Sequence, residues 1–388
     1  MKRITVNERP NLMCEANRHG LEYSVDQGIP GWSEAAYYQF TLRQIEEDIE
    51  GPAQEIEDMC FQVVERAINN EGVLHRLGVK EIYWDYIAES WRKGEKNLYG
   101  RMDLSYDGVS PAKLLEYNAD TPTALYETAV FQWEWLEQSM EIGLIPERCD
   151  QLNDLHESIV EAFPHLNVAD LSHFSCNPDI EDDKGTINYL EECAQEAGLK
   201  TCFLAMEDIG LNEQGRFTDL DDQVISTLFK LYPWEWMMEE EFGSKILSSG
   251  VRFIEPPWKM ILSNKGLMPL LWGMFEGHPN LLPSYFEDDP SVRDLIDNGS
   301  YVRKPLLSRQ GENIKIIHNG ETKHHSDGPY GKGGCIVQGF QSLPEYDGYF
   351  PLVGCWLVAS KAVALCIRED NTLVTGKDCN IIPHVILD

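Results

Sequence analysis

Residues 99–120 read YGRMDLSYDGVSPAKLLEYNAD, and this stretch decides how the rest of the chain is interpreted. Polar and apolar residues alternate over 101–106 and again over 113–118, a period typical of β-strands. The intervening DGVSP at 107–111 contains a glycine that tolerates positive φ and a proline that fixes φ near a turn value. The stretch therefore predicts a β-hairpin.

The register of this hairpin predicts a cluster of polar side chains. A four-residue loop at 108–111 pairs Asp103 with Glu116 and Arg101 with Asn118, and residues two apart on a strand share a face. Two opposed carboxylates repel each other unless a cation lies between them. Oxygen ligands from Asp, Glu and Asn suit a hard cation such as Mg²⁺, and an adjacent arginine suits a phosphoryl group.

The alternative interpretation is a solvated hairpin face that carries an incidental acid pair. Leu114, Leu115 and Tyr117 make the second strand apolar enough to be partly buried, which weighs against that alternative. The pairing argument by itself predicts a convergent polar site and does not identify its ligand.

A strand–helix–strand pattern is predicted between residues 166 and 206. Its parts are an apolar run at 168–174, a helical segment at 186–197 that ends before Gly198, and a second apolar run at 201–206. Such a unit implies parallel strands. The turn after the first strand has no glycine fingerprint for nucleotides, so we expect this unit to be scaffold or the wall of a substrate cleft.

The other segments of the chain predict a long helix, a packing segment, a loop and a series of strands. We expect Ser33 to cap a long helix that runs to about Asn69 and breaks near Gly51. We expect the aromatic stretch 232–236 to serve packing, and the Gly- and His-rich stretch 319–334 to be a mobile lid. The C-terminal segment predicts strands at 301–307, 314–318, 335–340, 349–358 and 362–368.

YGRMD at 99–103, followed by KLLEYNADTPT at 113–123, resembles the synthetase domain of glutathionylspermidine synthase and more closely its stand-alone acid–amine ligase relatives. The likeness covers nearly the whole chain. It implies a mixed α/β ATP-grasp fold in permuted order, in which the metal-binding hairpin precedes the lysine-bearing lobe. One ligase unit would span 1–388, with a helical region and the hairpin (99–120) in 1–150, a βαβ substrate lobe like a pre-ATP-grasp domain in 151–250, and a nucleotide lobe in 251–388.

The resemblance also implies roles for individual residues. Arg101 would stabilise the transferring phosphoryl group, and Asp103, Glu116 and Asn118 would hold two Mg²⁺ ions. Lys265 precedes an apolar helix, whose N-terminus suits an anion. The predicted ATP site comprises Arg101, Asp103, Lys265, Lys304, Gln310, Gly311, Gln338, Gln341 and Arg368. A further nucleotide-contacting glutamine of the family falls on Leu352, which leaves part of the adenine site undefined.

The activity implied by the resemblance is ATP- and Mg²⁺-dependent ligation of a carboxylate to an amine through an acyl phosphate, with release of ADP and phosphate. The amine would be a polyamine and the acid a glutathione-like peptide. The alternatives are a non-catalytic ATP-binding protein of the same fold and a kinase acting on a small acid. The cysteine amidase domain of the bifunctional family members has no counterpart here, so we do not expect hydrolysis of the amide product.

Composition argues against two classes of partner, whereas the resemblance implies small-molecule acid and amine substrates. A net charge of −33 opposes binding to nucleic acid or an anionic membrane, and no apolar run reaches the ~18 residues of a membrane span. Residues 301–388 carry nine basic and nine acidic residues, which leaves 23 of the 32 basic and 56 of the 65 acidic residues upstream. Ten cysteines without a C-x-x-C pair predict reduced thiols and a cytoplasmic protein. The sequence does not indicate an oligomeric state.

Overall fold

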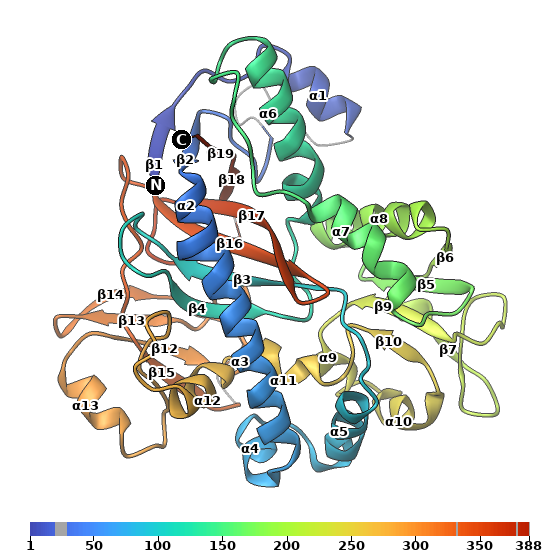
Figure 1. The fold of residues 1–388 in the computed structure, drawn as a ribbon. Helices are drawn as coiled ribbons and strands as arrows, with labels where there is room; N and C mark the ends of the chain where they lie inside the picture. The colour runs from blue at the N-terminus through green and yellow to red at the C-terminus, as the bar shows by residue number, and fades with distance from the viewer. Residues whose placement is uncertain (20–28, 331–332, 378, 388) are drawn as a thin grey trace.

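The computed structural model describes residues 1–19, 29–330, 333–377 and 379–387. Within these ranges the strands form two five-stranded sheets and sheets of four, three and two strands, with helices packed between and around them. Figure 1 shows the long helix α3 (Gly51–Ile68) running past the sheets, with the hairpin β3–β4 behind it. The fold is therefore mixed α/β, as predicted.

A central antiparallel sheet joins strands from opposite ends of the sequence, in the order β18-β17-β16-β3-β4. Its strands are β3 (Tyr99–Ser105), β4 (Lys113–Asn118), β16 (Phe350–Val358), β17 (Lys361–Asp370) and β18 (Asn380–Ile382). The teal hairpin lies between the red strands β16 and β17 and the orange strands of the second sheet (Figure 1). Every residue of β3 is buried inside the sheet, whereas β4 forms the edge of the sheet and is partly buried.

The predicted hairpin register is confirmed at the four polar positions. Asp103 faces Glu116 and Arg101 faces Asn118. The register shifts after Asp103 and leaves Leu115 unpaired as a bulge, so the connecting loop is longer than the four residues expected. The turn is stabilised by Asp107, whose carboxylate accepts hydrogen bonds from the backbone N–H groups of Val109 and Ser110.

The second five-stranded sheet is antiparallel, in the order β11-β15-β12-β13-β14. Its strands are β11 (Ser284–Phe286), β12 (Tyr301–Pro305), β13 (Lys315–His318), β14 (Glu321–His325) and β15 (Cys335–Gly339). The loop expected at 319–334 is wrong in its first half, where β14 pairs with β13, and the role of this stretch as a lid stays a prediction. Residues 331–332 of that stretch lie outside the described residues.

The predicted βαβ unit is confirmed within a parallel sheet of order β10-β9-β5-β6. Strands β5 (Leu171–Cys176) and β6 (Lys200–Phe203) pair in parallel and are joined through helix α8 (Glu181–Glu196). The sheet is completed by β9 (Thr227–Leu231) and β10 (Arg252–Ile254). A separate ribbon pairs β7 (Gly210–Leu211) with β8 (Phe217–Thr218).

The N-terminal prediction was wrong at its start. Ser33 caps no helix, because the residues after it form β2 (Ala36–Phe40), between β1 (Lys2–Thr5) and β19 (His384–Ile386). Thr41 instead caps α2 (Leu42–Ile45) in a capping box. A π-helical turn at Glu46–Glu50 leads directly into α3, so the chain stays helical through Gly51.

The remaining helices cover the sheets. They are α1 (Leu12–Arg18), α4 (Glu71–Arg76), α5 (Trp84–Arg92), α6 (Gln132–Glu141), α7 (Leu155–Ala162), α9 (Trp234–Met237), α10 (Ile246–Ser249), α11 (Lys259–Ser263), α12 (Leu267–Met274) and α13 (Val292–Asp297). One apolar core forms around α3, and a second forms around α6, α7 and α8. Both cores reach the central sheet, which therefore fixes the position of the hairpin.

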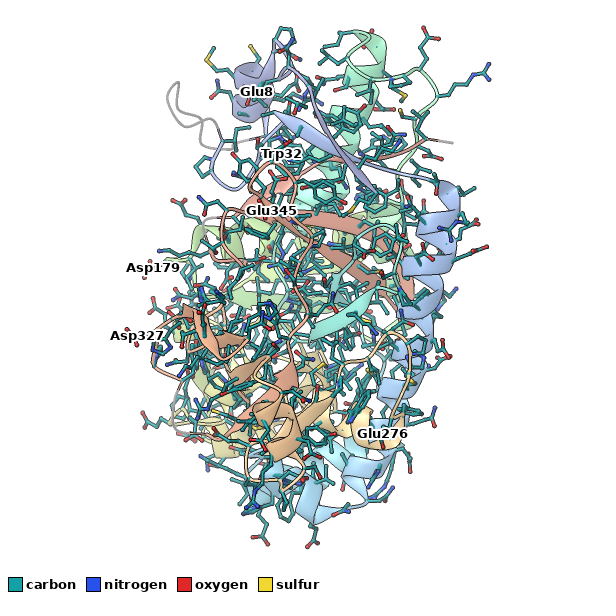
Figure 2. The ribbon with its side chains drawn as sticks, turned by 90° about the vertical axis from the view of Figure 1, so that its left-hand side faces the viewer. Glu8, Trp32, Asp179, Glu276, Asp327 and Glu345 are labelled. Atoms are coloured by element: carbon teal, nitrogen blue, oxygen red, sulfur yellow. The ribbon has the colours of Figure 1, made fainter. Side chains whose placement is uncertain are left out.

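The division into ranges 1–150, 151–250 and 251–388 stays a prediction, and the central sheet contains strands from the first and the last of them. Exposed acids such as Asp179, Glu276 and Asp327 lie at separate places on the surface (Figure 2), which agrees with a general solvating role for most carboxylates. None of the helices in the described ranges is of a length and apolarity that would let it cross a membrane.

Candidate active site

The predicted site residues surround one cavity of about 690 Å³. The central sheet, the second five-stranded sheet and the loop between β12 and β13 all contribute to its wall. The predicted residues that line it are Arg101, Asp103, Glu116, Asn118, Lys265, Lys304, Gln310, Gly311, Gln338, Gln341 and Arg368. A cavity of this size accommodates a ligand of nucleotide dimensions.

Asp103 is the fully buried centre of the polar cluster on the hairpin. Its Oδ1 accepts a hydrogen bond from Arg101 Nε at 2.9 Å, and its Oδ2 accepts from Asn118 Nδ2 at 2.8 Å and from Arg368. Gly354 pairs with Asp103 on the adjacent strand, and a Cβ there would lie 2.8 Å from Arg101 Cδ. The absence of a side chain at Gly354 therefore makes room for Arg101 beside the carboxylate.

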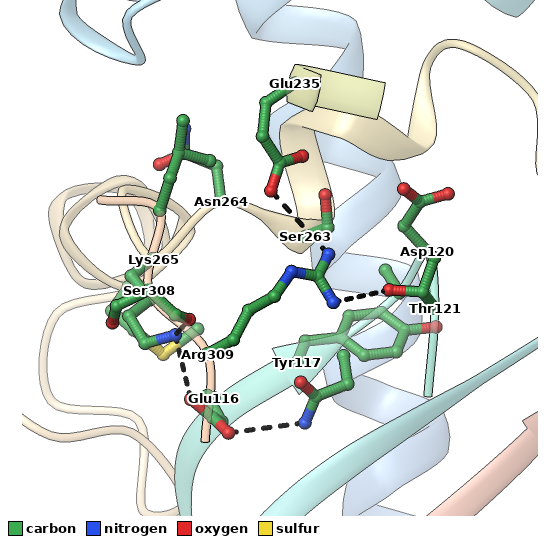
Figure 3. Close-up of a pocket in the computed structure, with 14 residues that line it drawn as sticks. Glu116, Tyr117, Asp120, Thr121, Glu235, Ser263, Asn264, Lys265, Ser308 and Arg309 are labelled. Carbon is green, nitrogen blue, oxygen red and sulfur yellow. Dashed lines mark hydrogen bonds and ion pairs between the residues drawn. The ribbon is translucent and has the colours of Figure 1, made fainter. Parts of the chain in front are cut away.

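Glu116 connects the hairpin to the lysine-bearing loop. Its Oε2 lies 3.2 Å from Lys265 Nζ, and its Oε1 accepts a hydrogen bond from Asn118 at 3.3 Å (Figure 3). Burial by itself raises the pKa of Glu116, but Lys265, Lys304 and Arg368 together hold that pKa well below its ordinary value. The carboxylate is therefore ionised throughout the physiological range.

Lys304 shows a use for the bulge in β4. Its Nζ donates to the unpaired carbonyl oxygen of Leu115 at 3.0 Å and to Gln338 Oε1 at 2.8 Å. Burial lowers the pKa of Lys304 to about 8, and Glu116 opposes that shift. Gln338 and Lys304 lie on neighbouring strands, so sheet pairing brings together two residues whose spacing in the sequence gave no such signal.

The remaining predicted residues differ in how firmly they are held. Gln310 and Gly311 both have positive φ, and a Cβ on Gly311 would lie 2.7 Å from Val374. Gln341 is exposed at the rim and bonds the carbonyl of the next residue. Leu352 is buried at the wall of the cavity, where it offers an apolar surface in place of an amide.

The side chains of the cluster fit a hard divalent cation. Asp103 and Glu116 face each other across the hairpin and each provides a carboxylate. The side-chain amide of Asn118 contacts both of them. Oxygen donors of this kind are those that Mg²⁺ takes in proteins. In their present arrangement the carboxylates are neutralised by arginine and lysine side chains, which are also the groups that bind phosphate.

A second part of the cavity was missed by the sequence reasoning. Its wall carries three acids, Glu127 near helix α6 and Asp182 and Asp183 in the first turn of α8, together with Trp236 and Arg309. Burial raises the pKa of Glu127 and raises that of Asp183 to about 6. The stretch 232–236 was predicted to serve packing rather than ligand binding. That holds for Trp234, which is fully buried, but Trp236 lines the cavity.

Two signals in the sequence pointed to this second part without identifying it. The acidic run at 181–183 opens a helix, where carboxylates are common for their interaction with the helix dipole. Arg309 precedes the predicted residues Gln310 and Gly311 in the same loop. Each feature had an ordinary structural explanation, and only the fold brings them together.

Comparison with known proteins places this mixed α/β chain among the ATP-grasp-type acid–amine ligases. The model of the family described as glutathionylspermidine synthase preATP-grasp matches residues 3–387, and the chain belongs to this family. A Haemophilus influenzae protein named as a candidate acid–amine ligase is 40% identical, and the match covers 99% of each chain.

Two longer relatives are more distant. The bifunctional glutathionylspermidine synthetase/amidase of Escherichia coli is 24% identical over 90% of this chain, and trypanothione synthetase of Crithidia fasciculata is 26% identical over 84%. The chain spans 60% and 52% of their respective lengths. A solved structure of a glutathione synthetase-like effector from Globodera pallida has a similar fold, with a TM-score of 0.57, 9% identity and 98% coverage of both chains.

Proposed function

We propose that this chain joins a carboxylate to an amine at the expense of ATP, through an acyl phosphate. The observation that carries the proposal is that Asp103, Glu116 and Asn118 converge around one cavity with the cations of Arg101, Lys265, Lys304 and Arg368. A carboxylate oxygen of the acid would attack the γ-phosphorus and release ADP. The amine nitrogen would then attack the acyl carbon, expel phosphate and lose a proton to form the amide.

The residues divide this work between binding and transition-state stabilisation. Asp103, Glu116 and Asn118 would hold Mg²⁺, which when bound neutralises phosphate charge and orients the γ-phosphate. Arg101 and Arg368 would contact the transferring phosphoryl group, since both guanidinium groups already lie against Asp103. Lys265 and Lys304 would bind phosphate oxygens, with the loop at 310–311 covering them. Gln338 and Gln341 would contact the adenine.

The acceptor we propose is a polyamine, and the acid a glutathione-like peptide. The polyamine is supported by Glu127, Asp182 and Asp183, which give one wall of the cavity a negative charge. Such a wall raises the local concentration of a polycation and speeds its encounter with the site. The relatives named as glutathionylspermidine synthetases support both substrates.

Release of ADP with paired acids and amines tests the reaction class. A ligase releases ADP in proportion to amide formed, and release requires both substrates. A small-acid kinase would release ADP with the acid alone, and a non-catalytic ATP-binding protein would release none above background. Hydroxylamine added without amine would trap the acyl phosphate as a hydroxamate, which separates the proposed intermediate from simple ATP hydrolysis.

Calorimetric titration with Mg-ATP tests the metal assignment. Glu116→Gln removes one anionic oxygen ligand and should weaken Mg-ATP binding by roughly tenfold or more, because a ligand's charge is lost from the site. Glu287→Gln, at an exposed ion pair with Arg303, serves as the control. An unchanged affinity in Glu116→Gln would remove Glu116 from the metal site.

Salt dependence tests the charge of the acceptor. For a polycation, kcat/KM should fall several-fold between low and moderate salt at constant Mg²⁺, because screening weakens the steering field, while the KM for ATP changes less. A flat salt profile for the amine, or turnover with alanine as rapid as with a polyamine, would leave a ligase whose acceptor is not a polycation.

A further inference from the structure

Two glutamates and a histidine meet where α1 lies beside α6 (Figure 1), apart from the described residues that line the large cavity. His19 caps the C-terminal end of α1, and its backbone N–H donates to the carbonyl oxygen of Glu15 at 3.0 Å. Residues four apart in a helix share a face, so both side chains point the same way. Glu134 comes from α6. One ligand atom from each of the three side chains lies within 4.8 Å of the others.

The imidazole of His19 is held in one orientation by its neighbours. Its Nδ1 forms a hydrogen bond with the hydroxyl of Tyr126, and its ring packs edge-on against Phe131 with the ring centres 5.4 Å apart. Its Nε2 points at Glu134 and lies 2.6 Å from Oε2. A histidine that binds a metal through one ring nitrogen generally forms a hydrogen bond to an oxygen with the other, and that bond fixes the ring. The contacts of His19 match this arrangement, with Tyr126 as the orienting partner.

The two carboxylates are only weakly neutralised by their present cation. Arg18 lies 3.3 Å from an oxygen of Glu15 and 3.3 Å from an oxygen of Glu134. Its side chain is 63% exposed, whereas those of Glu15 and Glu134 are 12% and 19% exposed. Ion pairs with so exposed an arginine contribute little. With a neutral imidazole, two negative charges face one positive charge, and a divalent cation would neutralise the remainder.

We propose that Glu15, His19 and Glu134 bind a divalent transition-metal ion, which ties α1 to α6 and stabilises their packing. One imidazole nitrogen and two carboxylate oxygens are ligands that Zn²⁺ takes at about 2.0–2.2 Å, and a water completes the tetrahedron. An imidazole ligand favours such an ion over Mg²⁺, which prefers oxygen ligands. The ion replaces the proton between Nε2 of His19 and the carboxylate of Glu134, and that proton is released to solvent. This site is separate from the ligase reaction.

The test is calorimetric titration of the whole chain with Zn²⁺ in excess Mg²⁺, which competes for sites made of oxygen ligands alone. Tyr126→Phe should weaken Zn²⁺ binding by roughly tenfold, because it removes the partner that orients the imidazole. His19→Gln removes a ligand and should weaken it by roughly a hundredfold or more. His325→Gln, which changes an exposed histidine beside Asp327, is the matched control and should leave the affinity unchanged. Equal affinities in the wild type and His19→Gln would overturn the inference.

The spectrum of bound Co²⁺ identifies the ligand atoms. Cys14 is exposed and adjoins Glu15 in the sequence, so its thiolate is the alternative ligand, and thiolates bind such ions well. Co²⁺ held by nitrogen and oxygen should show visible d–d bands without the near-ultraviolet charge-transfer band of a thiolate. Cys14→Ser should keep this spectrum, and His19→Gln should abolish it. A thiolate band that disappears in Cys14→Ser would overturn the inference.

Arg18→Gln distinguishes metal binding from a general loss of folding, since it is expected to improve binding. It removes the exposed competing charge and should tighten Zn²⁺ binding by roughly twofold to fivefold, the range expected for exposed ion pairs. Zn²⁺ should also raise the thermal midpoint of the wild type and leave that of His19→Gln unchanged. Weaker binding in Arg18→Gln, or equal shifts of the midpoint in the wild type and His19→Gln, would contradict the site. These measurements use no nucleotide, acid or amine, so they are independent of ligase activity.

Discussion

The two sides of the cavity place carboxylates in opposite environments. On the hairpin side Glu116 is surrounded by Lys265, Lys304 and Arg368, which hold its pKa well below the ordinary value despite burial. On the opposite side burial raises the pKa of Asp183 to about 6, and it raises the pKa of Glu127 as well.

This difference indicates the sign of the charge on the ligand that each side of the cavity would bind. The hairpin side has cations in excess of what its carboxylates need, and these are the groups that bind phosphates. The opposite side has acids without enough cations, and it would be stabilised by a positively charged ligand. Residue type alone does not distinguish the two sides, because neighbouring charge decides the role.

The largest effect is expected at a buried carboxylate that is already paired with a cation. Asp120 and Lys230 form a fully buried ion pair at 2.6 Å beside the cavity. Asp120→Asn should lower the free energy of unfolding by roughly 3–5 kcal/mol, because Lys230 is left buried and uncompensated. Asp183→Asn, which removes an acid with no such partner, is the control and should cause no loss. Denaturant unfolding measures both, and equal losses would contradict the comparison.

The hairpin side is tested next through Arg101. Arg101→Lys keeps the positive charge but loses the planar guanidinium that spans Asp103 and the carbonyl of Thr123. We expect kcat to fall by roughly 10²–10³, as for the loss of a comparable transition-state donor, with little change in the KM for ATP. The measurement is ADP release at saturating substrates. A raised KM with unchanged kcat would give Arg101 a ground-state binding role instead.

Lys304 tests the hairpin side through the pH dependence of the affinity for Mg-ATP. Burial lowers its pKa to about 8, so its charge is present below pH 8 and is lost as the pH rises through that value. The affinity for Mg-ATP should therefore fall above pH 8, by up to about tenfold per pH unit. Lys304→Arg keeps a charge at these pH values and should flatten the profile. Identical profiles in the two proteins would show that another group titrates.

The smallest expected effect concerns Asp183. Its pKa is raised on folding from 3.8 to about 6, so the carboxyl is more readily ionised in the unfolded chain. Its contribution to stability is present below about pH 4 and is lost as the pH rises towards 6. Asp183→Asn should therefore gain stability relative to the wild type across that interval. Thermal melts at pH 4 and pH 6.5 measure the change, and a constant difference would contradict the assignment.

The sequence predicted best where the structure is local. The pairings of Asp103 with Glu116 and of Arg101 with Asn118 followed from the side-chain period of a strand and the turn residues between the arms. The βαβ unit followed in the same way from periodicity. The positions of Lys265 and Lys304 around the same cavity came from the family resemblance, because no local rule links residues so far apart.

The failures have a common physical cause. The segment Ala36–Phe40 is rich in aromatic residues, which favour strands, and pairing with β1 and with the distant β19 makes it a strand. Gly51 did not break the helix, since the π-helical turn Glu46–Glu50 continues directly into α3 at this residue. Arg309 lies far along the sequence from the adjacent residues Glu235 and Trp236, so its proximity to them depends on tertiary structure.

The order of strands in the central sheet has a consequence for synthesis on the ribosome. The hairpin pairs with β16, and Arg368, which bonds Asp103, follows that residue by 265 positions. The arginine that balances the buried carboxylate therefore leaves the ribosome after most of the chain has been made. A nascent chain contains the acids of the hairpin long before it contains this cation. The polar cluster is therefore complete only after Arg368 has been synthesised, long after the hairpin itself.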